Sequence, residues 1–93
     1  MSISIKKLSN DVFEVTVVET STTTHMVTVT DQRLNDLTDN NVTKTQLLEF
    51  SFKFLLVREQ NSSILKSFDI IEISRYFSNY RDKVRRWCDE SQN

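Results

Sequence analysis

The chain has 93 residues and a formal net charge of −1, so it is long enough for one small domain and carries almost no overall charge. It contains no glycine and no proline, which excludes the usual forms of glycine-rich phosphate loops, dinucleotide-binding fingerprints and serine-nucleophile elbows. The single cysteine, Cys88, excludes an internal disulfide and a cysteine-based metal site, and it favours a reducing, cytoplasmic compartment.

Residues 1–30 are predicted to form strands, because apolar and polar residues alternate in three short segments: 3–6, 12–18 and 25–30. Residues 9–11 and 19–23 are the polar connections, and Asn10 is expected to take a positive φ where glycine is missing. Three strands joined in this way predict an antiparallel meander with one face on a core.

The hydrophobic period then changes to that of a helix. Residues 31–38 are predicted to form a short helix with Thr30 or Asp31 as its N-cap. Residues 39–41 end this helix, with asparagine in place of the usual glycine.

The next helix has the strongest start signal in the chain. Thr43 and Gln46 have the spacing of a capping box, and the helix is predicted to continue to about Glu59. It is apolar on most sides, so it is expected to form the centre of the core.

Two further helices are predicted after a short helical turn or linker at residues 62–67. Asp69 and Glu72 form a second box-like pair, which predicts a helix from Asp69. Ser78 is expected to cap the last helix.

The predicted fold is therefore α+β: an N-terminal three-stranded antiparallel meander packed on a C-terminal layer of three to four helices. Residues 1–93 are expected to form a single small domain, with strands in residues 1–30 and helices in residues 31–90. No apolar run approaches the length of about 20 residues that a membrane span needs.

The sequence offers few groups for catalysis, and no catalytic, metal-binding or cofactor-binding residue is predicted. His25 is the only histidine and is expected near the sheet edge, in phase with Val27; a dyad with a carboxylate such as Asp31 is the catalytic alternative. Cys88 lies near the end of the last predicted helix, where the helix dipole disfavours a thiolate, so a structural or merely exposed thiol is expected.

The segment 75–87 interleaves basic and aromatic side chains, as nucleic-acid-binding surfaces do. The same spacing suits an amphipathic helix that packs on a core with basic residues around its apolar stripe. Both interpretations stay open at this point. The basic residues that would form a surface for a protein partner or a nucleic acid are Arg75, Arg81, Lys83, Arg85 and Arg86.

Residues 26–58 resemble a ribbon-helix-helix unit, the dimeric DNA-binding fold of many small bacterial repressors and antitoxins. The resemblance rests on the alternating segment 26–30, the short helix after it and the helix that starts at Thr43. It implies that alternate ribbon side chains read bases and that the start of the second helix holds a phosphate. The implied DNA-contact residues are Met26, Thr28, Thr30, Thr43, Lys44 and Thr45.

The ribbon segment departs from this pattern in two ways. It has no Arg, Lys, Asn or Gln, the side chains that discriminate best between bases. It also follows two predicted strands, which would occupy the edge that a ribbon needs for pairing across a dimer. The deciding observation is whether strand 26–30 pairs within one chain or across a two-fold axis.

A second resemblance spans residues 24–80. It is carried by the segments 24–29, 48–59, 63–68 and 73–77, which are similar to short bacterial proteins described only as uncharacterised. The resemblance implies a compact bacterial domain and brings no activity with it.

The sequence therefore predicts a non-enzymatic bacterial cytoplasmic protein that binds another protein or associates with itself. A nucleic-acid-binding regulator of the ribbon-helix-helix kind is the alternative. A hydrolase or transferase that works through His25 and a carboxylate is a third hypothesis, and it requires a concave pocket beside His25.

Overall fold

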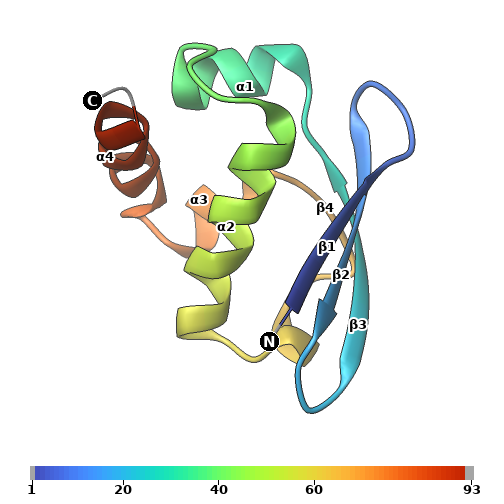
Figure 1. The fold of residues 1–93 in the computed structure, drawn as a ribbon. Helices are drawn as coiled ribbons and strands as arrows, with labels where there is room; N and C mark the ends of the chain where they lie inside the picture. The colour runs from blue at the N-terminus through green and yellow to red at the C-terminus, as the bar shows by residue number, and fades with distance from the viewer. Residues whose placement is uncertain (1, 92–93) are drawn as a thin grey trace.

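The computed structural model describes residues 2–91 and shows an α+β fold in which helices cover one face of a four-stranded sheet (Figure 1). The fold class predicted from the sequence is confirmed. Residues 1, 92 and 93 of the predicted domain lie outside the described residues. In chain order the elements are β1 (Ser2–Lys7), β2 (Val12–Val18), β3 (Thr22–Thr28), α1 (Asp31–Thr38), α2 (Lys44–Arg58), the 3₁₀ turn η1 (Asn61–Ser63), β4 (Ser67–Asp69), α3 (Glu72–Tyr76) and α4 (Tyr80–Ser91).

The sheet has the order β1-β2-β3-β4, and its first three strands form the predicted antiparallel meander. Successive side chains of a strand point to opposite faces. On β2, Phe13, Val15 and Val17 are buried in the core, while Glu14 and Thr16 between them remain partly exposed. One face of the meander therefore supplies the core, as the alternation in the sequence predicts.

Strand β3 begins and ends earlier than predicted. The sequence indicates a strand over 25–30, but residues 22–24 already pair with β2, and the ladder stops at Thr28. Three consecutive threonines fit a pleated strand because they are β-branched, so polar residues expected in a loop extend the hairpin instead.

A fourth strand, β4, corrects the predicted start of the helix that follows it. Residues 67–69 pair in parallel with β3, where the sequence predicts the end of a linker and the start of a helix at Asp69. The Asp69 carboxylate accepts a hydrogen bond from the backbone N–H of Ile71 at 3.0 Å, which closes a turn rather than capping a helix. Helix α3 therefore begins only at Glu72.

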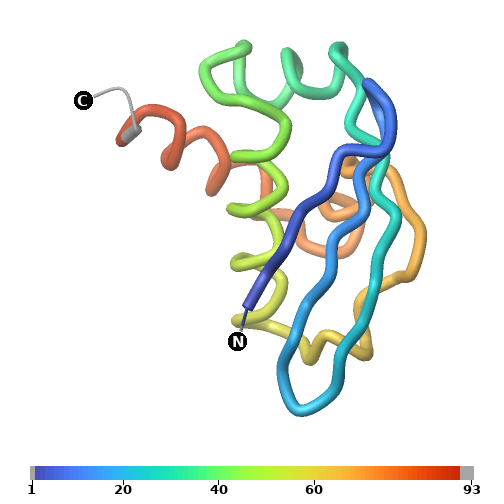
Figure 2. Tube along the Cα trace, turned by 45° about the vertical axis from the view of Figure 1, so that its right-hand side comes forward, coloured from blue at the N-terminus to red at the C-terminus, as the bar shows by residue number. Residues whose placement is uncertain are grey.

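Helix α2 has the predicted capping box. The Thr43 hydroxyl accepts a hydrogen bond from the backbone N–H of Gln46 at 3.1 Å, and the Gln46 side chain accepts one from the backbone N–H of Thr43 at 2.9 Å. The helix lies between the sheet and α4 (Figures 1 and 2). Side chains such as Phe52 are completely buried. None of the helices in residues 2–91 has the length and apolar character of a membrane span.

Two of the polar turns show how the chain manages without glycine. Asp39, the left-handed C-cap of α1, and Asn40 after it have φ angles of 54° and 59°, so an aspartate shares with the predicted asparagine the role of the usual glycine. The prediction of a positive φ at Asn10 is wrong. The turn before β2 is closed instead by the Ser9 hydroxyl, which accepts a hydrogen bond from the backbone N–H of Val12 at 3.2 Å.

A buried polar pair joins α4 to α2. The Ser51 hydroxyl donates to the Leu47 carbonyl oxygen at 2.7 Å, so it accepts the hydrogen bond from the Tyr80 hydroxyl, 2.6 Å away. Burial raises the pKa of the Tyr80 phenol, and the hydrogen bond to Ser51 offsets only part of this effect.

This pair makes the stability of the fold sensitive to alkaline pH. Because the fold favours the neutral phenol, its contribution is complete below the unfolded-state pKa of about 10 and is lost as the pH rises above that value. In urea unfolding, we expect the free energy of unfolding of Tyr80→Phe to fall less steeply between about pH 9 and pH 11 than that of the wild type. Tyr76→Phe is the matched control, since its ring is exposed. Equal slopes for wild type and Tyr80→Phe would contradict the assignment.

Candidate functional site

The predicted basic surface is divided between structural contacts and solvent. Arg75 lies on α3, with its guanidinium 3.0 Å from the Glu72 carboxylate. Arg85 lies on α4 and donates to the Asp39 carboxylate and to the Asp36 carbonyl oxygen, so it ties α4 to the end of α1. Two of the five predicted basic residues therefore already have acceptors within the chain.

The other three basic residues are exposed on α4 but do not share one face. A helix turns about 100° per residue, so Arg81 lies about 160° from Lys83 and about 140° from Arg86 around the axis. Asp82 lies between Arg81 and Arg86. Tyr80 is fully buried on the remaining side. Helix α4 thus follows the amphipathic packing pattern, and the structure does not gather the predicted basic residues into one patch.

Three of the six side chains implied as DNA contacts are engaged within the chain. Thr30 caps α1, and Thr43 caps α2. The Lys44 ammonium lies 2.8 Å from the Asp31 carboxylate and 3.2 Å from that of Asp11. Burial opposes the charge on Lys44, but the two carboxylates outweigh this effect and raise its pKa. Lys44 is therefore already neutralised by partners of its own chain.

Strand β3 does not have the free edge that a ribbon requires. It pairs with β2 along one edge and, from Met26 to Thr28, with β4 along the other. Met26 and Thr28 alternate with buried Val27 and so belong to the outer face of the sheet, whereas Thr45 is exposed in the first turn of α2. Pairing within one chain opposes the ribbon-helix-helix interpretation of this segment.

His25 is buried in the core and does not lie at an exposed sheet edge. Its Nδ1 is 2.8 Å from the Leu65 carbonyl oxygen and its Nε2 is 2.8 Å from the Thr23 hydroxyl. Since a carbonyl oxygen only accepts, Nδ1 carries a hydrogen and donates. The ring also packs against Phe52, with the centroids 5.4 Å apart. Asp31 belongs to the ion pair described above, so the structure does not form the dyad considered as a catalytic alternative.

Cys88 is buried in the core, on the side of α4 that faces the rest of the fold. Burial raises the pKa of its thiol, which leaves the unreactive, protonated form favoured. In residues 2–91, no three His, Cys, Asp or Glu side chains lie close enough together to hold a metal ion.

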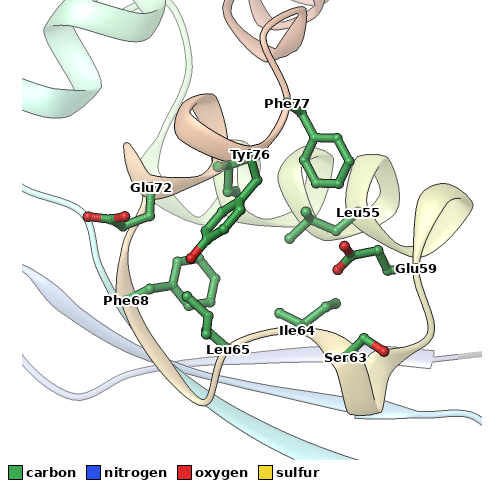
Figure 3. A pocket seen from close by; sticks show the side chains of 10 residues that line it. Leu55, Glu59, Ser63, Ile64, Leu65, Phe68, Glu72, Tyr76 and Phe77 are labelled. Atoms are coloured by element: carbon green, nitrogen blue, oxygen red, sulfur yellow. The ribbon is translucent and has the colours of Figure 1, made fainter.

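A groove of about 140 Å³ opens between the C-terminal end of α2, the segment after η1, β4 and α3 (Figure 3). We call this feature the α2–α3 groove. Its floor is apolar and comes from elements far apart in sequence: Leu55, Ile64, Phe68, Ile73 and Phe77. Leu65 and Tyr76 line its exposed side, with 46% and 65% of their surface open to solvent.

The charged side chains that line the α2–α3 groove are acidic. Glu59, the C-cap residue of α2, points its carboxylate into the groove between Leu55 and Ile64 (Figure 3). The carboxylate of Glu72 points away from the groove and pairs with Arg75. Glu59 thus brings a partly buried negative charge to an apolar surface, at a helix end where the dipole is itself negative.

A broader hollow of about 360 Å³ lies over the stacked rings of Phe50 and Trp87, between α2 and α4. Its charged side chains satisfy each other, because the Lys53 ammonium lies 3.1 Å from the Glu49 carboxylate. The hollow therefore offers no unpaired charge to a ligand, and the α2–α3 groove is the stronger candidate for a binding site.

The α2–α3 groove was not predicted from the sequence, because each of its apolar residues was assigned either to a helix face that packs on the core or to the linker between helices. One signal was present in the sequence. Glu59 places a carboxylate at the end of a helix, where a basic residue is the favourable choice.

Comparison of the chain with protein-family models, with curated proteins and with solved structures gives no significant match.

The contact between His25 and Leu65 holds β3 to the segment that lines the groove. His25→Leu leaves the Leu65 carbonyl without its donor, so we expect the free energy of unfolding to fall by about 2 kcal/mol. The backbone N–H of Met26, which donates to the Lys66 carbonyl at 2.7 Å, should exchange its hydrogen faster. Thr24→Leu, on the outer face of the same strand, is the control and should change the stability little. Unchanged stability and exchange in His25→Leu would contradict this role.

The ion pair of Lys44 should appear in the acid stability of the protein. Lys44 lowers the pKa of the Asp31 carboxyl, so this pair stabilises the fold above the unfolded-state pKa of about 4 and is lost as the pH falls below it. Lys44→Met should be less stable at neutral pH and lose less stability between about pH 4 and pH 2, as measured by thermal unfolding. Lys53→Met is the control, because it removes the exposed ion pair between Lys53 and Glu49 on the same helix. It should change neither the stability at neutral pH nor the loss of stability between about pH 4 and pH 2.

Proposed function

We propose that the protein is a non-enzymatic binding module that holds one apolar side chain of a protein partner in the α2–α3 groove. The observation that carries the proposal is the groove itself: an apolar floor of buried and half-buried residues that opens to solvent beside Leu65 and Tyr76. Open apolar surface of this kind is typical of interaction sites.

The size of the groove favours a side chain over a small-molecule ligand. Sites for cofactors and drug-sized ligands have volumes of about 300 to 1,000 Å³, whereas a cavity of about 150 Å³ holds one benzene ring. The groove, with about 140 Å³, therefore matches a single leucine or phenylalanine side chain.

The residues at the rim support the same conclusion. Tyr76 projects from α3 over the groove, and Leu65 lies beside it (Figure 3). Tyrosine is enriched in protein interfaces because its ring gives a large contact area and its hydroxyl remains able to bond. The two rim side chains would contact the backbone on either side of an inserted anchor.

A peptide selection tests this function. Random dodecapeptides displayed on phage would be selected on the wild-type protein, and the enriched peptides would be synthesised and measured by calorimetry. Leu65→Asp and Tyr76→Ser should each weaken their binding by about tenfold or more, because the first places a charge beside the apolar floor and the second removes a contact ring. Both side chains are exposed, so these variants should keep the fold.

Val57→Asp is the matched control. Val57 is 83% exposed on α2 and does not line the groove, so this variant should bind the peptides as the wild type does. Failure to enrich any peptide, or equal binding by all three variants, would contradict the proposal. Light scattering would detect dimerisation. A dimer that forms in the wild type and not in Leu65→Asp would assign the groove to a second copy of the chain, and it would overturn the proposal that a different protein binds there.

A further inference from the structure

We infer that the α2–α3 groove selects a partner segment in which a lysine or arginine stands next to the inserted apolar side chain, and that Glu59 recognises the positive charge. The inference rests on the proposed function and names the chemistry of the partner. It is carried by the position of one carboxylate, which Figure 3 shows directed into the groove.

The Glu59 carboxylate has no ion-pair or side-chain hydrogen-bond partner among residues 2–91. The nearest basic residue in sequence, Arg58, is committed elsewhere: its guanidinium lies 3.6 Å from the centre of the Phe54 ring and donates to the Phe54 carbonyl oxygen at 2.8 Å. Arg75, on the opposite side of the groove, pairs with Glu72. The basic side chains around the groove therefore leave Glu59 unneutralised.

The Glu59 carboxylate lies among apolar side chains, at the C-terminal end of a helix. Leu55 and Ile64 flank the carboxylate and reduce its contact with water (Figure 3). The C-terminal end of α2 adds the negative end of a helix dipole. A cation beside the carboxylate would supply the positive charge that a helix C-terminus favours, and its charge-assisted hydrogen bond would be stronger than one between neutral groups.

The rest of the groove restricts where that cation stands. The apolar floor leaves space for one side chain, and the carboxylate lies at its edge, beside the α2 end. A lysine or arginine adjacent to the anchor would place its charge on Glu59 and its aliphatic stem over the apolar rim. A free amine without an apolar neighbour would leave the floor exposed to water, so a peptide segment fits better.

Three capped tetrapeptides test the inference: acetyl-Ala-Leu-X-Ala-amide with lysine, norleucine or glutamate at X. Titration into ¹⁵N-labelled protein, followed through the amide signals of Leu65 and Tyr76, would give the three affinities. The lysine peptide should bind the wild type about fivefold to tenfold more tightly than the norleucine peptide, and the glutamate peptide should bind most weakly.

Two substitutions of Glu59 assign the preference to this residue. Glu59→Gln should remove the difference between the lysine and norleucine peptides, and Glu59→Lys should favour the glutamate peptide. Glu49→Gln, on the exposed side of α2 and outside the groove, should keep the wild-type preference. Circular dichroism of each variant would establish that the fold is retained.

The outcomes separate this inference from the proposed function. Equal affinities of the lysine and norleucine peptides for the wild type, with shifts at Leu65 and Tyr76, would overturn the charge selection and leave the groove as a binding site. A preference for the lysine peptide that persists in Glu59→Gln would overturn only the role of Glu59 and not the charge selection. Absence of any shift at these residues with all three peptides would count against the proposed function itself.

Discussion

The burial of helix α2 on several sides is the constraint on which the rest of the structure depends. Its phenylalanines reach different elements: Phe52 packs against His25 of β3 and Phe68 of β4, while Phe50 stacks on Trp87 of α4. Phe54 meets rings from the region of α3 and α4. Residues two apart on a helix lie about 200° apart around its axis, so alternate phenylalanines require cover from opposite sides. The sheet and α4 provide that cover.

Because the middle of α2 is covered on several sides, its two ends are the parts of the helix that lie nearest to solvent. At the N-terminal end, the Thr43 capping box and the ion pairs of Lys44 satisfy the exposed groups. At the C-terminal end, the chain turns through η1 and β4 to α3, and the last apolar turn of α2 becomes one wall of the groove. The two ends of one helix therefore differ: one is closed by side-chain bonds and the other is open.

Local signals in the sequence predicted the elements that depend on local interactions. The Thr43 cap, the Asn40 turn and the alternation of the meander each involve residues a few positions apart. Strand β4 was missed because it has three residues and pairs with a strand some 40 positions earlier, while Asp69 forms a turn that resembles a cap. The burial of His25 likewise depends on the distant carbonyl of Leu65. No local pattern reports contacts of this kind.

The candidate site was harder to predict because a sequence displays charges without their partners. The sequence suggested Arg85 and Lys44 as contacts for a partner because they are basic, but in the fold both pair with carboxylates of the same chain. Glu59 was not predicted as a site residue, since a single glutamate at a helix end is common. Its environment distinguishes it: Thr43 caps the other end of α2, whereas the Glu59 carboxylate lies against apolar side chains of the groove. Departures from local rules without compensation within the fold tend to mark functional positions, because the missing partner comes from outside.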